Sequence, residues 1–102
     1  MLAVYIPCKD KKEATRISMR LLEKKLIACA NLIPISSLYL WKGKLTSDKE
    51  VVILAKTTDK KFAAIEKEAT ALHSYHCPCI TSWKIEKANA SYEQWVNEMV
   101  GE

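Results

Sequence analysis

The stretch that decides the fold is residues 27–57, IACANLIPISSLYLWKGKLTSDKEVVILAKT. It contains two apolar, β-branched runs, residues 27–41 and 44–57, on either side of the pair Lys42–Gly43. Such runs predict strands, and a glycine that adopts a positive φ suits the tight turn between them. Pro34 has no N–H, which predicts a bend or an edge position within the first strand.

The predicted hairpin is long for a chain of 102 residues. A strand of about 14 residues spans about 45 Å, whereas a compact domain of this size is about 35 Å across. The tip, with Tyr39, Leu40 and Trp41, is therefore expected to project beyond its own core. Because exposed strands pair readily with other chains, we expect the hairpins of several subunits to associate.

The flanking sequence predicts one further strand on each side and three helices. An apolar run predicts a strand over residues 2–8, and Asp10 with Glu13 resembles a capping box that opens a helix over residues 10–26. Thr58 or Asp59 is expected to cap a second helix that runs to Leu72. Residues 79–86 read as the last strand, and residues 90–100 read as a terminal helix with a Ser91–Gln94 capping box.

The predicted order is β-α-β-β-α-β with one extra helix at the carboxyl end. This order is the split βαβ, ferredoxin-like pattern of the α+β class, in which an antiparallel sheet carries two helices on one face. We expect residues 1–102 to form a single domain, because nothing in the sequence resembles a linker or a repeat.

Composition excludes several classes of protein. The formal net charge is +4, but only Arg16 and Arg20 among the 16 basic residues are arginine, so no nucleic-acid surface is expected. No apolar run approaches the length of a membrane span, and no segment reads as a signal peptide, so a cytoplasmic location without membrane contact is expected. Four cysteines in such a chain argue against a disulfide framework.

The run HSYHCPCI, residues 73–80, carries the most distinctive chemistry. It holds both histidines and two of the four cysteines, which are ligands of soft and borderline metal ions. In an extended segment Cys77 and Cys79 point to the same side, about 7 Å apart at Cα, whereas His76 points away. The alternative is that Cys77 is a packing residue, His76 is a surface residue and His73 caps its helix.

Several segments together resemble the CutA divalent-cation-tolerance family. They are ACANLIP, LYLWKGK, ILAKTT, LHSYHCPCI and SYEQW, in the family's order and spacing over nearly the whole chain. The resemblance implies a ferredoxin-like fold, a homotrimer, and a role in tolerance of copper and other divalent metals. It also implies a structural similarity to PII-like signalling proteins, but it implies no enzymatic reaction.

The resemblance also implies site residues. Metal-site proposals for the family involve positions that match Cys8, His73 and Cys79, the last of which is usually a glutamate. This chain further departs from the family pattern at Ser74, His76 and Cys77, and at Lys42 in the hairpin turn. Replacing a carboxylate with a thiol makes a site softer, so copper first and zinc second are the expected ions.

Two ligand sets are consistent with the predicted fold. The first is Cys8, His73 and Cys79, with Cys77 as a fourth ligand, because the first and last strands are neighbours in this fold. The second and weaker set is His73, His76 and Cys77. If neither set binds metal, these residues have only packing or surface roles.

A rival interpretation concerns the aromatic residues. One possibility is a cleft between subunits that holds a small ligand, as in a PII-like signalling trimer; the other is that the same side chains only stabilise the trimer. The residues in question are Tyr39, Trp41, Lys56, Tyr75 and Trp95. No Ser-His-Asp set, glycine-rich phosphate loop or paired-carboxylate site is present, so no catalytic activity is expected.

Overall fold

The computed structural model describes all residues from Met1 to Glu102 and contains one four-stranded sheet. The strands are β1 (Leu2–Cys8), β2 (Cys29–Trp41), β3 (Lys44–Thr57) and β4 (Thr81–Lys84), all antiparallel to their neighbours in the order β2-β3-β1-β4. The helices are α1 (Lys11–Glu23), α2 (Phe62–Leu72) and α3 (Ala90–Met99), and a short 3-10 turn, η1 (Asp59–Lys61), precedes α2. The predicted order of strands and helices is thus confirmed.

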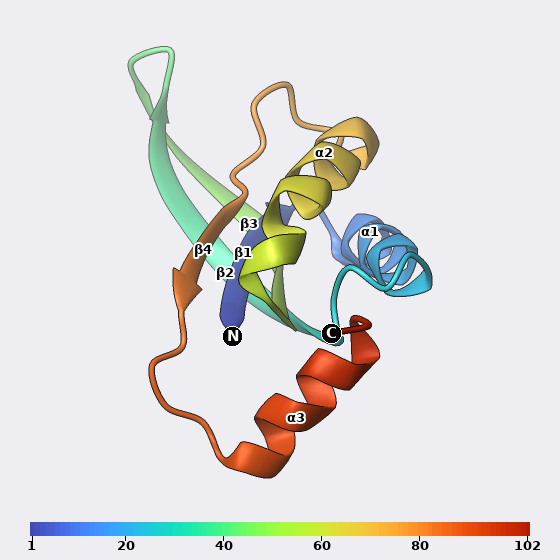
Figure 1. Cartoon of the computed structure of the whole chain (residues 1–102). Helices are drawn as coiled ribbons and strands as arrows, with labels where there is room; N and C mark the ends of the chain where they lie inside the picture. Colours follow the sequence, from blue (N-terminus) through green and yellow to red (C-terminus); the bar gives the residue numbers. More distant parts are fainter.

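The helices α1 and α2 lie on one face of the sheet, and α3 lies at the end where the chain begins (Figure 1). Alternate residues of β1 and β3 face the two helices and form the core with their apolar stripes, as period-two and helical patterns require. The fully buried members are Val4, Ile6, Cys8, Ala14, Ile17, Leu21, Ile27, Ile53, Ala55, Ile65 and Ala69. A second small cluster joins α3 to the sheet through Ala28, Val96 and Val100.

The last strand is shorter than the sequence predicts. The prediction covered residues 79–86, but β4 pairs with β1 only from Leu2↔Lys84 to Tyr5↔Thr81. Continuing this register would place Pro7 opposite Cys79 and Cys8 opposite Pro78. Because a proline has no N–H to donate to a ladder, the pairing ends before these positions, and Cys79 stays in the loop that follows α2.

The predicted helix caps are only partly confirmed. The Asp10 carboxylate accepts the Glu13 N–H at 2.8 Å, but the Glu13 side chain accepts the Lys9 N–H instead of that of Asp10. The Ser91–Gln94 capping box is wrong, because α3 begins at Ala90, so Ser91 lies inside the helix and Asn89 precedes it without a side-chain cap bond. Thr58 precedes η1 and its hydroxyl bonds the Glu102 carboxylate, so it does not cap α2.

Helix α1 ends in a Schellman motif in which lysine occupies the position usually taken by glycine. The Leu26 N–H donates to the Leu21 carbonyl at 2.9 Å, and the Lys25 N–H donates to the Leu22 carbonyl at 3.0 Å. Lys25 has a φ of 56°, in the left-handed region that is strained for residues with a Cβ. The helix therefore stops before residue 26, the predicted end.

We expect the substitution Lys25→Gly to stabilise the protein by about 1 kcal/mol, because glycine adopts this backbone conformation without strain. In thermal unfolding followed by circular dichroism, the midpoint should rise by about 4–8 °C. Lys24→Gly is the matched control. Lys24 has a φ of −85°, so its backbone is not strained and glycine removes no strain there. A gain of equal size in the control would contradict the explanation.

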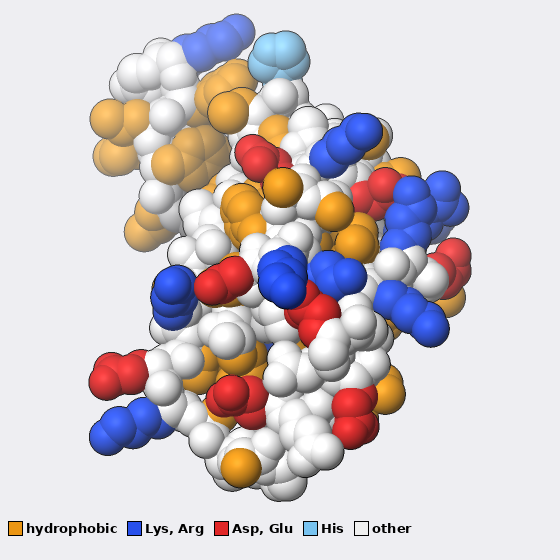
Figure 2. Space-filling view, viewed as in Figure 1, with side chains coloured by type: hydrophobic (Ala, Val, Ile, Leu, Met, Phe, Trp, Pro, Cys, Tyr) orange, Lys and Arg blue, Asp and Glu red, His pale blue; other side chains and the backbone are white.

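The β2–β3 hairpin projects beyond the core, as its length predicted (Figure 1). The chain measures 46 × 26 × 20 Å, and its radius of gyration is 14.2 Å, against about 12.8 Å for a compact chain of this length. Leu38 is 82% exposed and Leu45 is 91% exposed near the tip. Figure 2 shows apolar side chains gathered on this projection at the upper left.

Candidate metal centre

Three side chains of metal-ligating type converge where β1, α1 and α2 meet. The ligand atoms of Cys8, Glu13 and His73 all lie within 4.8 Å of one another. Cys8 ends β1 and faces the helices because it continues the alternation of Val4 and Ile6. Glu13 lies in the first turn of α1, and His73 directly follows α2, with its N–H bonded to the Ala69 carbonyl at 2.9 Å.

The hydrogen bonds of His73 define its tautomer. Its side chain is fully buried, and Nε2 lies 2.8 Å from the Pro7 carbonyl oxygen. Because a carbonyl only accepts, Nε2 carries the proton, and Nδ1 accepts the Tyr75 N–H at 3.1 Å. The imidazole is therefore neutral, with Nδ1 facing Glu13 Oε1 at 4.0 Å.

Glu13 is a buried carboxylate that stays charged. Burial opposes the charge, but N–H groups of Lys9 and Ser74, which donate to its two oxygens at 3.0 and 2.9 Å, outweigh it and lower the pKa of Glu13. From the sequence alone, Glu13 was expected only as a capping residue and was not among the predicted ligands. The capping pattern could have indicated this role, because a capping glutamate reaches back toward the residues before its helix. In this chain those residues adjoin Cys8.

Cys8 is a neutral thiol in this arrangement. It is fully buried, and its Sγ lies 3.7 Å from the Ile6 carbonyl oxygen. Burial, followed by the negative charges of Glu13, Glu50 and Asp10, raises the pKa of Cys8 to about 12. A metal ion that binds this sulfur must displace its proton, which makes the affinity dependent on pH.

The structure brings together only two of the ligands predicted from the sequence, Cys8 and His73. Cys77, Cys79 and His76 are exposed on the loop between α2 and β4, and none of them belongs to the group formed with Glu13. Cys79 Sγ has a hydroxyl neighbour instead, Thr81 Oγ1 at 3.9 Å. The early end of the β1–β4 ladder keeps Cys79 from pairing alongside β1, where Cys8 lies.

The residues of the predicted ligand cleft are scattered over the single chain. Tyr39 and Trp41 lie on the projecting hairpin, and Lys56 donates to the Asn31 side chain at 3.0 Å. Trp95 packs beside Tyr92 on α3, and Tyr75 donates its hydroxyl to Glu50 Oε2 at 2.6 Å. No single site within one chain contains all five.

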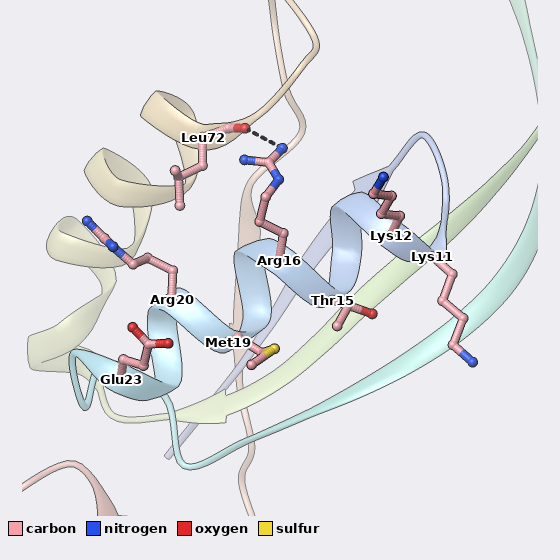
Figure 3. A pocket seen from close by; sticks show the side chains of 8 residues that line it. All are labelled: Lys11, Lys12, Thr15, Arg16, Met19, Arg20, Glu23 and Leu72. Atoms are coloured by element: carbon pink, nitrogen blue, oxygen red, sulfur yellow. Dashed lines mark hydrogen bonds between the residues drawn. The ribbon is translucent and has the colours of Figure 1, made fainter.

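Two hollows of the surface lie elsewhere. One of about 800 Å³ runs along α1 beside Leu72, where Arg16 donates to the Leu72 carbonyl at 3.2 Å (Figure 3). The other, of about 470 Å³, lies between the start of α1 and the hairpin. Neither is lined by a cysteine, a histidine or any residue of the predicted cleft, so neither contains the candidate metal ligands.

Fold and site together define the class: a small α/β protein with an antiparallel four-stranded sheet and a buried thiol–carboxylate–imidazole group of metal-ligating type. The chain belongs to the CutA1 divalent ion tolerance protein family, whose model matches residues 2–99.

Named relatives support this assignment. The divalent-cation tolerance protein CutA of Archaeoglobus fulgidus is 42% identical over 97 residues, which cover 95% of each chain. The CutA protein of Thermotoga maritima is 39% identical over 98% of this chain and 99% of its own. A solved structure of the A. fulgidus protein superposes with a TM-score of 0.94, covering 98% of this chain and 99% of its own.

That solved structure is described as a periplasmic divalent cation tolerance protein. In the present chain, no helix has the length and apolar character needed to cross a membrane. The cytoplasmic location expected from the sequence stays a prediction.

Proposed function

We propose that this chain binds a borderline or soft metal ion, copper first and zinc second, and that this binding contributes to tolerance of divalent cations. The observation that carries the proposal is the convergence of Cys8, Glu13 and His73 within 4.8 Å in the buried interior. The names of the relatives point to the same role.

The donor set suits these ions. A thiol, an imidazole and a carboxylate are ligands of zinc and of copper, whereas magnesium and calcium prefer oxygen ligands throughout. Three protein ligands leave one position open in a tetrahedral site. With metal–ligand bonds of about 2.0–2.3 Å, neighbouring donors lie about 3.3–3.8 Å apart. The ligand atoms lie within 4.8 Å of one another, so the side chains have to move closer together on binding.

Binding requires two further changes. Nδ1 of His73 has to release the Tyr75 N–H, whereas Glu13 keeps its N–H bonds because each oxygen has a second lone pair. The three side chains are shielded from solvent, so an ion reaches them only through a local opening of the structure. We therefore expect affinity to rise with pH, as Cys8 gives up its proton.

The proposal includes a ferredoxin-like topology and a homotrimer. The order β2-β3-β1-β4, with β1 and β3 central, is the order of two interlocked split βαβ units. The single chain exposes 6763 Å², about 900 Å² more than the roughly 5,800 Å² expected for a monomer of this mass. The strands β2 and β4 are the two edges of the sheet, so each has an outer edge free to pair with another chain. The sheet face away from the helices carries the half-exposed Trp83, which another subunit could cover.

A cytoplasmic location is also part of the proposal. All four cysteines are free thiols, a state that the cytosol maintains.

The experiment that tests the buried centre is an isothermal titration with Zn²⁺ of the unchanged chain, Cys8→Ser and His73→Ala. Each substitution removes one of the three ligands. Altering a residue that only contacts a ligand weakens metal affinity by roughly tenfold to hundredfold, so each of these substitutions should weaken Zn²⁺ affinity by more than that. Cys29→Ser is the matched control, because Cys29 lies outside the group and contacts the Tyr92 hydroxyl at 3.3 Å.

Thermal unfolding of each variant without metal separates loss of ligand from loss of fold. Affinities of Cys8→Ser and His73→Ala equal to that of the unchanged chain would refute the buried centre.

A further inference from the structure

The net positive charge of the molecule is concentrated on one helix. Residues 11–25, which are α1 and the two lysines that follow it, contain six basic and two acidic residues. This segment therefore has the same formal charge as the whole chain, +4, and the basic and acidic residues elsewhere balance. Of its two carboxylates Glu13 is buried, so only Glu23 is exposed. Figure 2 shows basic side chains over α1, at the right of the view.

Four of these basic residues form a row along the helix. Lys12, Arg16, Arg20 and Lys24 follow one another at intervals of four residues, which places them on one side of α1, about 6 Å apart along its axis. The first three line the hollow of about 800 Å³ that lies between α1 and Leu72, at the end of α2 (Figure 3). The basic row is therefore one wall of a recess in the surface.

Contacts with α2 hold the basic row in place without neutralising it. Arg16 donates to the Leu72 carbonyl at 3.2 Å, and Arg20 lies 3.2 Å from one oxygen of Glu68. Lys24 lies 2.8 Å from the other oxygen, so two cations share one carboxylate. The side chains of Arg16 and Arg20 are still 53% and 51% exposed, and a guanidinium has five N–H groups to donate. Both arginines of the chain are thus positioned in advance for a further acceptor.

We propose that the basic row is a docking surface for an acidic segment of a partner protein, bound in an extended conformation. Alternate side chains of an extended segment lie on one side, about 7 Å apart, which is close to the spacing of about 6 Å along the row. Aspartate or glutamate at every second position therefore faces Lys12, Arg16 and Arg20 in turn. Carboxylates match the planar fork of arginine, and the half-exposed Met19 adds apolar surface beside it.

Nucleic acid and a membrane fit this surface less well. Single-stranded nucleic acid stacks its bases on aromatic side chains, and none lines the hollow. A helix that lies on a membrane inserts a wide apolar face, whereas the apolar stripe of α1 is buried in the core. The docking surface uses none of Cys8, Glu13 and His73, so it does not depend on the proposed metal binding.

Fluorescence anisotropy with a labelled peptide tests the docking surface. The peptide has glutamate at every second position and serine between, and a comparison peptide has the same residues with all glutamates in one block. We expect the alternating peptide to bind about fivefold more tightly, because fewer carboxylates of the block can face the row at once. Binding should weaken as the salt concentration rises, since these charges are exposed.

Substitutions in the hollow measure what the basic residues contribute. Arg16→Gln should weaken binding about tenfold, and Lys11→Gln/Lys12→Gln about fivefold. The matched control is Lys60→Gln/Lys87→Gln, which also removes two exposed charges but lies outside the hollow, and it should change the affinity by less than about twofold. Thermal unfolding checks Arg16→Gln, which loses a bond to α2, whereas the lysine variant changes only exposed side chains.

Two outcomes would overturn the docking surface: equal affinities for the two peptides, or equal losses in the lysine variant and in the control. A labelled single-stranded oligonucleotide and anionic vesicles are compared in the same way. Tighter binding of either, lost in the same variants, would overturn the assignment of an acidic protein segment as the partner.

Discussion

Replacing Leu38, Leu40 and Leu45 together with lysine is expected to convert the proposed homotrimer into monomers. The three side chains are 82%, 66% and 91% exposed on the projecting hairpin, an unusual concentration of apolar surface for a small soluble domain. If they are buried between subunits, each contributes about 1.5–3 kcal/mol to association. Lysine removes this contribution and adds like charges that repel one another across a symmetric interface.

Light scattering coupled to gel filtration at micromolar concentration measures the outcome. The unchanged chain should have a molar mass about three times the 11.6 kDa of one chain. The triple variant should have the mass of a single chain. The matched control is Met19→Lys, since Met19 is 55% exposed on α1, away from the hairpin. A monomeric mass for the unchanged chain, or a trimeric mass for the triple variant, would exclude this assembly.

The substitution Glu13→Gln is expected to destabilise the fold by about 2–3 kcal/mol at neutral pH, because hydrogen bonds to a buried charged acceptor are stronger than neutral ones. Both carboxylate oxygens accept N–H groups, one from Lys9 and one from Ser74. A glutamine keeps one acceptor oxygen and turns its NH₂ group toward the other donor. The loop after α2 thereby loses one of its attachments to α1.

The effect of Glu13→Gln should depend on pH with a definite sign. Since the pKa of Glu13 is lowered in the folded state, its charge stabilises the fold above the unfolded value of 4.5, and this contribution disappears as pH falls through the folded pKa. The stability difference between the unchanged chain and Glu13→Gln should be full at pH 7 and shrink below about pH 4.5.

Urea unfolding at a series of pH values measures this difference. The matched control is Glu23→Gln, an exposed glutamate in the last turn of the same helix, which should change stability by less than about 0.5 kcal/mol. A difference that stays constant or grows on acidification would contradict the role assigned to Glu13.

Much of the fold follows from local pattern. The two long runs around Lys42–Gly43 predicted β2, β3 and the projecting tip, because strand length and turn chemistry are properties of short segments. Ile17, Leu21, Ile65 and Ala69 recur at helical spacing, and they form the buried stripes of α1 and α2. Cys8 and His73 were expected to meet because β1 and β4 are neighbours in the predicted topology.

Other features depended on contacts between segments distant in the sequence. The sequence by itself determined which elements form and which face of each is apolar, because these depend on residues a few positions apart. Only the tertiary structure decided that Glu13 completes the buried group and that Cys79 stays out of it. Glu13 is brought to His73 by the packing of α1 beside α2. Cys79 is left in the loop because Pro7 and Pro78 occupy neighbouring rungs, one on each strand, where the β1–β4 ladder would have to continue.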